Sequence, residues 1–334
     1  MLDERKTAIL SAVVQEYIAT ALPVGSTHVV DAPGVRVSPA TVRNEMAVLE
    51  QEGYLVQPHT SAGRIPTDKG YRFFVDHLAA PGGLDQRTTA RVGEFFSAAH
   101  GRVEEMLHRT TELLARLTNY AGVVVGPTAQ VQLVRSVQLV RLSSEVATVV
   151  AVLGNGAVES ETIDIAAELS DAQIATASAH LDAQCSGHPL GRVAEPAPSG
   201  DESVDQLCGD ALSALISGAA DAHVYLGGTA TMASAFDAVD IVTDVLRTLE
   251  QQFVVVSLVS DLVERGMSVA IGGEHGVQPL SACSVVVAPI VVDGEHRGSV
   301  GVLGPTRMNY PQALATVEVV SDRLARRMEG PERG

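Results

Sequence analysis

The spacing of apolar residues along the first 78 positions predicts three helices followed by a short hairpin. An apolar face recurs at helical spacing over Leu10–Ala21, and Pro23 ends this helix. Ser26 is the expected N-cap of a short second helix that contains Val29 and Val30. Ser38 followed by Pro39 predicts a helix start, because a serine side chain caps the first turn and proline needs no amide partner there. We expect this helix to end at Gly53.

A two-stranded hairpin and a further helix are predicted next. Tyr54–Val56 and Arg64–Pro66 are the expected strands on either side of a turn-rich tip, and Thr67–Arg72 opens the helix. Three helices and a hairpin in this order follow the plan of a winged helix-turn-helix. The window from Gln57 to Arg72, which covers the hairpin tip, the second strand and the start of the next helix, has a net charge of +2 from three basic residues and one acidic residue. These residues are Arg64, Lys69, Arg72 and Asp68.

The helix that starts at Ser38 carries polar side chains suited to reading DNA. Val42, Met46 and Leu49 form its predicted buried stripe. The side chains left on or beside the outward turns are Ser38, Thr41, Arg43 and Asn44. Arginine can bond guanine through two hydrogen bonds, asparagine can do the same with adenine, and a helix N-terminus favours a phosphate. An ordinary solvated face is the alternative interpretation of this helix taken alone.

The predicted hairpin lies where a wing would meet the DNA backbone or the minor groove. Its candidate contacts are His59, Thr60, Ser61 and Arg64 at the tip, with Lys69 and Arg72 behind them. A hairpin with scattered charges is the alternative, and the local excess of basic residues argues against it.

Net charge and aromatic content set the N-terminal segment apart from the rest of the chain. The 334 residues carry 40 acidic and 23 basic side chains, a net charge of −17. Residues 1–78 hold seven basic and nine acidic side chains, or −2, so the remainder carries −15. This balance excludes a histone-like protein and a polybasic membrane binder, but it leaves room for a small DNA-reading face. Seven of the twelve aromatic residues fall in the first 96 positions, and Ala79–Gly83 is a break typical of a linker.

Later segments predict a mixture of helices and strands. A helical pattern covers Asp85–Tyr120, strands follow over residues 131–165, and Tyr310–Met328 closes the chain as a helix. Gly154–Gly156 is a strong hairpin turn. Further helices are expected at 169–181, 204–216, 235–250 and 257–265, with strands at 223–226, 267–271, 280–292 and 297–303. The segment 220–330 is expected to form a mixed sheet flanked by helices.

Five motifs match a known family of regulators. They are Pro23–Ser26, Ser38–Met46, Gly53–Thr67, Ile271–His275 and Gly301–Tyr310. Together they resemble the heat-inducible transcription repressor family HrcA, and the string Gln57–Pro66 is the most specific part of the match. The resemblance covers nearly the whole chain and is weak between about 155 and 220. His275 departs from the asparagine usual in that family, so a role that needs the asparagine amide is not carried over.

The resemblance implies an α+β multidomain fold. Its expected parts are an N-terminal winged helix-turn-helix DNA-binding domain at 1–80, a GAF-like α/β domain at 84–129 and 221–330, and an inserted α+β dimerisation domain at 130–220. The implied function is that of a homodimeric repressor, which binds an inverted-repeat operator called CIRCE upstream of chaperone operons. The implied partner is the GroEL chaperonin, which keeps the repressor active. The chain start does not resemble a secretion signal, so we expect a cytoplasmic protein.

Nothing in the sequence predicts catalysis, a cofactor or a metal site. Cys185, Cys208 and Cys283 lie far apart, and the ten histidines show no metal-ligand spacing. Gly227–Thr229 lacks the lysine of a phosphate-binding loop and is interpreted as a turn. Gly272–Gly276 is interpreted as a glycine-rich turn after a strand, although a ligand or metal corner is an alternative.

Three alternative functions stay open at this point. The first is a winged-helix regulator that senses a small molecule in the GAF-like domain. The second is an enzyme that uses the Gly272–Gly276 corner, and the third is a module whose winged helix binds proteins instead of DNA. The basic residues near the hairpin argue against the third.

Overall fold

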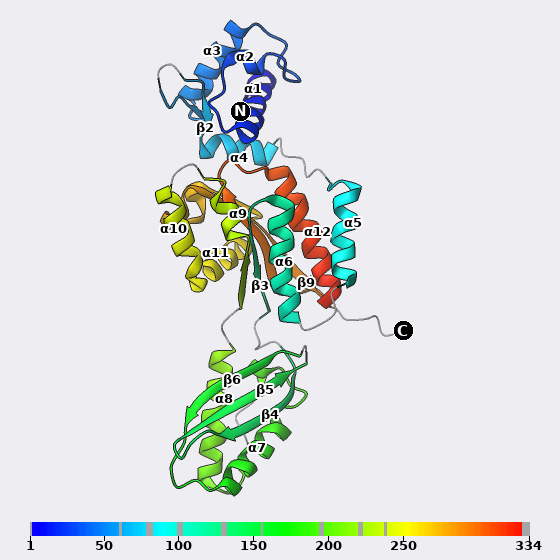
Figure 1. The fold of residues 1–334 in the computed structure, drawn as a ribbon, viewed down its shortest axis with the longest axis vertical. Helices are drawn as coiled ribbons and strands as arrows, with labels where there is room; N and C mark the ends of the chain where they lie inside the picture. The colour runs from blue at the N-terminus through cyan, green and yellow to red at the C-terminus, as the bar shows by residue number, and fades with distance from the viewer. Residues whose placement is uncertain are drawn as a thin grey trace.

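The computed structural model describes residues 2–59, 62–77, 83–98, 103–127, 132–154, 156–193, 197–219, 223–236 and 239–328. Three parts follow one another along the long axis of the molecule (Figure 1). The N-terminal part lies at one end, a central part built on a five-stranded sheet lies in the middle, and a part built on a three-stranded sheet lies at the other end.

The N-terminal part contains the three helices and the hairpin that the sequence predicts. Its elements are α1 (Glu4–Thr20), α2 (Ser26–Val29), α3 (Pro39–Gln51), β1 (Leu55–Val56), β2 (Ile65–Pro66) and α4 (Asp68–His77). The strands β1 and β2 are antiparallel, with Val56 opposite Ile65. The predicted buried stripe of α3 is confirmed, since Val42, Met46 and Leu49 are fully buried. The buried stripe of α3 packs into the same core as α1.

The central part is a five-stranded sheet with helices on both faces. The strands are β3 (Ala121–Val125), β7 (Val224–Gly227), β8 (Val269–Ile271), β9 (Cys283–Val292) and β10 (Glu295–Pro305), in the order β7-β3-β10-β9-β8. One face is covered by α5 (Gln86–Ala98), α6 (Val103–Thr118) and α12 (Tyr310–Met328). The other is covered by α9 (Thr229–Ala233), α10 (Val239–Glu250) and α11 (Gln252–Glu264). Two short 3-10 turns, η3 (Gly272–His275) and η4 (Gln278–Leu280), connect β8 to β9.

The third part is inserted between two neighbouring strands of the central sheet. β3 and β7 pair antiparallel, with Val125 opposite Val224, yet almost a hundred residues of chain separate them in sequence. That chain forms β4 (Val134–Arg141), β5 (Val146–Leu153), β6 (Val158–Asp164), α7 (Asp171–Cys185), η2 (Leu190–Arg192) and α8 (Glu202–Gly218). The three strands are covered by α7 and α8 and bury a core of their own (Figure 1).

The prediction of a mixed sheet at 220–330 is wrong, because every pairing in the five-stranded sheet is antiparallel. The β9–β10 connection explains part of this result. Asp293 and Gly294 both have positive φ, which is the geometry of a two-residue hairpin turn, and such a turn joins antiparallel strands.

Other elements also differ from the prediction, either in their bounds or because they were not predicted. The helical pattern over Asp85–Tyr120 corresponds to two helices, α5 and α6, and the helix expected over 235–250 starts at Val239. Ala121–Val125 is a strand that the sequence analysis did not predict. All five of its residues are buried, so it lacks the apolar–polar alternation that identifies a half-exposed strand. Most of the predicted linker Ala79–Gly83, and Asn155 of the predicted turn, lie outside the described residues.

Close packing between β3 and α6 gives a test of the central part. A Cβ added at Gly122 would lie 2.2 Å from the carbonyl oxygen of Thr111. We expect Gly122→Ala to lower the free energy of unfolding by about 1–3 kcal/mol, because backbone must shift to make room. Gly93→Ala on α5 is the control, since no atom lies within 4 Å of its added Cβ and alanine favours a helix. Urea unfolding of both variants measures this, and equal stabilities would contradict the packing described.

Candidate nucleic-acid interface

The start of α3 is built as the sequence predicts. Ser38 is the N-cap, and its hydroxyl oxygen accepts a hydrogen bond from the Thr41 amide at 3.2 Å. Pro39 occupies the first helical position. The Ser38 and Thr41 hydroxyls lie 3.0 Å apart, so the two candidate residues form one small polar group at the helix N-terminus.

Arg43 and Asn44 extend the polar surface of α3. Both side chains are exposed, and neither has a hydrogen-bonding or ionic partner among the residues that the structure describes. A guanidinium and an amide without intramolecular partners keep their donors available for a ligand. Because Val42, Met46 and Leu49 face the core, these two side chains point away from the body of the N-terminal part.

The hairpin is held close to the segment before α2. Val24 and Arg64 exchange two backbone hydrogen bonds, each 2.9 Å long. Gly63 makes this approach possible, because a Cβ there would lie 2.4 Å from the Val24 carbonyl carbon. At the tip, the Gln57 side-chain amide donates to the Ala62 carbonyl at 2.9 Å. His59 is exposed beside it, whereas the candidate residues Thr60 and Ser61 lie outside the described residues.

Two of the predicted basic contacts have partners inside the N-terminal part. The Arg64 guanidinium donates to a Glu50 carboxylate oxygen at 3.0 Å, and its side chain is only 15% exposed. The Lys69 ammonium donates to the Glu52 carbonyl at 2.7 Å and lies 4.4 Å from the centre of the Tyr54 ring. Arg64 therefore joins the hairpin to α3, while Lys69 stays at the surface.

Arg72, expected behind the hairpin as a DNA contact, lies against the central part in the structure. Its guanidinium points to the central part, where it pairs with both carboxylate oxygens of Glu274 and donates to the Val269 carbonyl at 2.9 Å. A third contact, to Asp76 on α4, is 3.2 Å long. With its donors engaged by these acceptors, Arg72 is a residue of the contact between parts. Sequence reasoning missed Glu274 as its partner, although the Gly272–Gly276 motif contains it.

The turn that carries Glu274 is organised by His275. The Val277 amide donates to His275 Nδ1 at 3.2 Å, so Nε2 carries the proton and donates to the Leu280 carbonyl at 3.0 Å. Burial lowers the pKa of His275, which favours this neutral form. The interpretation of Gly272–Gly276 as a structural turn agrees with these contacts. No group of three potential metal-ligating side chains occurs within the described ranges.

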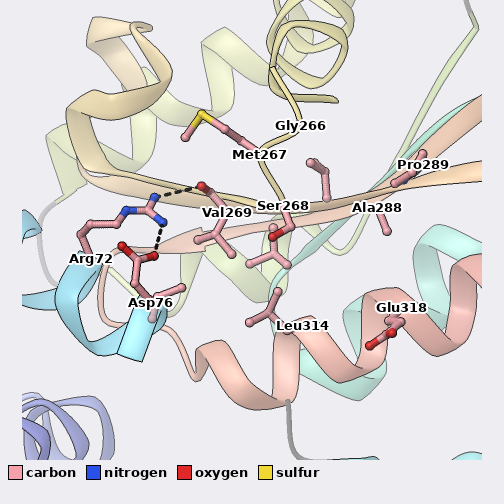
Figure 2. A pocket seen from close by; sticks show the side chains of 13 residues that line it. Arg72, Asp76, Gly266, Met267, Ser268, Val269, Ala288, Pro289, Leu314 and Glu318 are labelled. Carbon is pink, nitrogen blue, oxygen red and sulfur yellow. Dashed lines mark hydrogen bonds and ion pairs between the residues drawn. The ribbon is translucent and has the colours of Figure 1, made fainter. Parts of the chain in front are cut away.

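A groove with a cavity volume of about 650 Å³ lies beside the Arg72 contact, between α4, β8, β9 and α12. Figure 2 shows Arg72 and Asp76 at one side of it and Glu318 at the other. The side chains between them are mainly apolar, among them Val75, Met267, Ala288 and Leu314.

Known proteins resemble this chain over its whole length. A family model described as "HrcA protein C terminal domain" matches residues 104–314. The chain belongs to the HrcA family. The heat-inducible transcription repressor HrcA of Pseudarthrobacter chlorophenolicus is 36% identical over 98% of this chain and 99% of its own length. The protein of the same name from Pelotomaculum thermopropionicum is 35% identical over 100% of this chain and 99% of its own length.

One solved structure also shares the architecture. A crystal structure of a protein described as hypothetical has a TM-score of 0.68 and 25% identity, covering 98% of this chain and 99% of that chain. The HrcA relatives are named as transcription repressors, and the contacts of Glu274 and His275 give Gly272–Gly276 a structural role. In the part of the chain that the structure describes, no helix has the length and apolar character needed to cross a membrane.

The close approach at Gly63 gives a test of the hairpin. We expect Gly63→Ala to break the hydrogen bonds between Val24 and Arg64, because the added Cβ overlaps backbone. The expected cost is about 1–3 kcal/mol. Amide hydrogen exchange of Val24 and Arg64 should speed up accordingly. Gly83→Ala, with no atom within 4 Å of its added Cβ, should leave both amides unchanged; equal exchange in the two variants would contradict this geometry.

Proposed function

We propose that this chain is a heat-inducible transcription repressor that reads operator DNA with the first turns of α3. The observation that carries the proposal is the pair of exposed side chains, Arg43 and Asn44, which have no partner among the described residues, in a chain of the HrcA family. Arg43 is assigned to a guanine and Asn44 to an adenine in the major groove. Ser38 and Thr41, at the helix N-terminus, are assigned to a nearby phosphate.

The N-terminal part is proposed to act as a winged helix-turn-helix domain. The order of α1, α2, α3 and the β1–β2 hairpin supports this assignment. Lys69 and His59 are proposed to contact the DNA backbone or minor groove, and Arg64 is proposed to hold the hairpin on α3. Thr60 and Ser61 belong to the same proposal on the basis of their place in the family motif. The net charge of −17 implies few phosphate contacts, so that base readout carries much of the affinity.

The remaining chain is proposed to supply dimerisation and regulation. The boundaries that we propose are 1–80 for the DNA-binding domain, 84–129 and 221–330 for the GAF-like domain and 130–220 for the inserted dimerisation domain. The separate core of the inserted part supports its treatment as a domain. A two-fold homodimer would match the symmetry of an inverted-repeat operator. The CIRCE operator, the GroEL chaperonin and a cytoplasmic location are proposed from the resemblance to the family.

Operator binding and chaperonin control can be measured together. We expect fluorescence anisotropy to show tighter binding to an inverted-repeat CIRCE duplex than to a scrambled duplex at fixed salt, and a larger difference when GroEL is added. Folded, dimeric protein that binds both duplexes equally would contradict the operator assignment. A preference that GroEL leaves unchanged would contradict the chaperonin assignment alone.

The assigned role of Arg43 gives a sharper test. We expect Arg43→Ala to weaken operator binding by about 1–3 kcal/mol per half-site and to leave binding to random DNA nearly unchanged, because the lost contact is to a base edge. Arg87→Ala on α5, another exposed arginine, is the charge-matched control. An equal loss on operator and random DNA would assign Arg43 to a phosphate instead.

The alternative of small-molecule control has one supporting observation, the groove beside α4. Calorimetric titration with cell metabolites would distinguish it from control by the chaperonin. Binding of a metabolite that changes operator affinity without GroEL would favour the alternative.

A further inference from the structure

Helix α4 is fixed to the DNA-reading elements on one side. The Thr67 hydroxyl donates to the Gly53 carbonyl at 2.7 Å, directly after α3 ends, and Lys69 bonds the Glu52 carbonyl. Gly70 approaches so closely that an added Cβ would lie 2.2 Å from the Tyr54 carbonyl oxygen. A rotation of α4 would therefore carry α3 and the hairpin with it.

The same helix is fixed to the central part on its other side. Arg72 forms a two-pronged contact with Glu274 and a further hydrogen bond with the Val269 carbonyl. Figure 2 shows the guanidinium between Asp76 of its own helix and Val269 of β8. Glu274 is itself held, because one of its oxygens accepts the Ile271 amide at 2.9 Å. Paired planar groups of this kind fix direction as well as distance.

Charge and burial make this contact stronger than an exposed ion pair. The side chains of Arg72 and Glu274 are 25% and 30% exposed. Burial alone would raise the pKa of Glu274, but the hydrogen bonds from Arg72 and the Ile271 amide outweigh burial and lower it. The carboxylate therefore stays ionised opposite the guanidinium.

A second contact lies one turn earlier on α4. The Gly273 amide donates to an Asp68 carboxylate oxygen at 3.4 Å, and a Cβ on Gly272 would lie 2.2 Å from the same carboxylate. Gly272 also has a φ of +54°, a conformation that side chains disfavour. Glycine at this position therefore lets the turn approach the Asp68 side chain without backbone strain.

The groove beside α4 limits how much packing can hold the helix. The cavity of about 650 Å³ borders Arg72, Val75 and Asp76, so this side of α4 is not covered by the central part. Tyr71, on another side of the helix, meets Tyr310 with ring centres 5.9 Å apart. The angle of α4 against the sheet therefore depends on the buried side of the helix, where Tyr71 packs in one core with Tyr310, and on the directional contacts of Arg72.

We propose that Arg72 and Glu274 are positioning residues that set the angle of α3 relative to the central part and thereby select the spacing between operator half-sites. This inference rests on the proposed function, because spacing has meaning only for a dimer that reads an inverted repeat. Each α3 binds one half-site by its own side chains, but both bind together only if their separation fits the DNA. A fixed angle raises the effective concentration of the second helix at one spacing and lowers it at the others.

The test compares two glutamate-to-glutamine changes that border the same groove. Glu274→Gln removes the charge opposite Arg72, whereas Glu318→Gln alters an exposed carboxylate on α12. Anisotropy is measured with a single half-site duplex and with duplexes whose half-site spacing changes in steps of one base pair. We expect Glu274→Gln to bind the single half-site within about twofold of the unchanged protein and to lose most of its spacing preference. Glu318→Gln should keep that preference.

A measurement without DNA separates this inference from the proposed function. Spin labels on Gln51→Cys and Glu264→Cys, both at exposed positions, report the distance between α3 and the central part. Burial raises the pKa of Cys185 and Cys208 to about 11 and that of Cys283 to about 12, which leaves the introduced cysteines as the reactive ones. Labelled chain is mixed with excess unlabelled chain, so that distances within one subunit dominate the double electron–electron resonance signal.

The outcomes are distinct. A distance distribution that broadens in Glu274→Gln and not in Glu318→Gln supports the positioning role. An unchanged distribution, or an unchanged spacing profile in a protein that prefers its operator, overturns it. If the unchanged protein shows no operator preference at any spacing, the proposed function fails, and the distance distributions still decide whether Arg72 and Glu274 set the angle.

Discussion

The burial of one stripe of α3 is the constraint on which the candidate interface depends. Val42, Met46 and Leu49 are fully buried in the core that α3 shares with α1. Turning α3 about its axis would bring these side chains into water, at about 1.5–3 kcal/mol for each one exposed. The rotation of the helix is therefore fixed, and with it the outward direction of Arg43 and Asn44. The proposed base contacts of α3 follow from this geometry.

The basic side chains near the hairpin serve different purposes despite their proximity in sequence. Arg64 pairs with Glu50 and holds the hairpin to α3, and Lys69 stays at the surface. Arg72 connects α4 to Glu274 on the central part. The net charge of +2 over Gln57–Arg72 is therefore larger than the positive charge available to DNA. Arg64 and Arg72 instead hold α3, the hairpin and the central sheet in their mutual orientation.

Local signals in the sequence predicted the elements that local forces determine. Ser38 and Pro39 correctly predicted the start of α3. The predicted helix Tyr310–Met328 has the same bounds as α12. Signals failed where the chain is apolar throughout, as in Ala121–Val125, whose burial on both faces removes the alternation of a strand. The Asp293–Gly294 turn was a readable hairpin signal that would have corrected the mixed sheet.

The role of Arg72 could not be predicted in the same way. Its partner Glu274 lies 202 positions further along the chain, and nothing near Arg72 in sequence distinguishes it from Lys69. Only the fold brings the turn after β8 against α4. The polar face of α3, by contrast, could be predicted because it depends on the stripe of one helix.

The most direct test of base reading by α3 replaces single guanines of the operator half-site with 7-deazaguanine, which lacks the N7 acceptor. Affinities are measured for the unchanged protein and for Arg43→Ala on each duplex. The account predicts one guanine whose replacement weakens the unchanged protein but not the variant, with a coupling of about 1–3 kcal/mol. Purely additive losses at every guanine would contradict the assignment of Arg43 to a base and, with it, the reading of DNA by this face of α3.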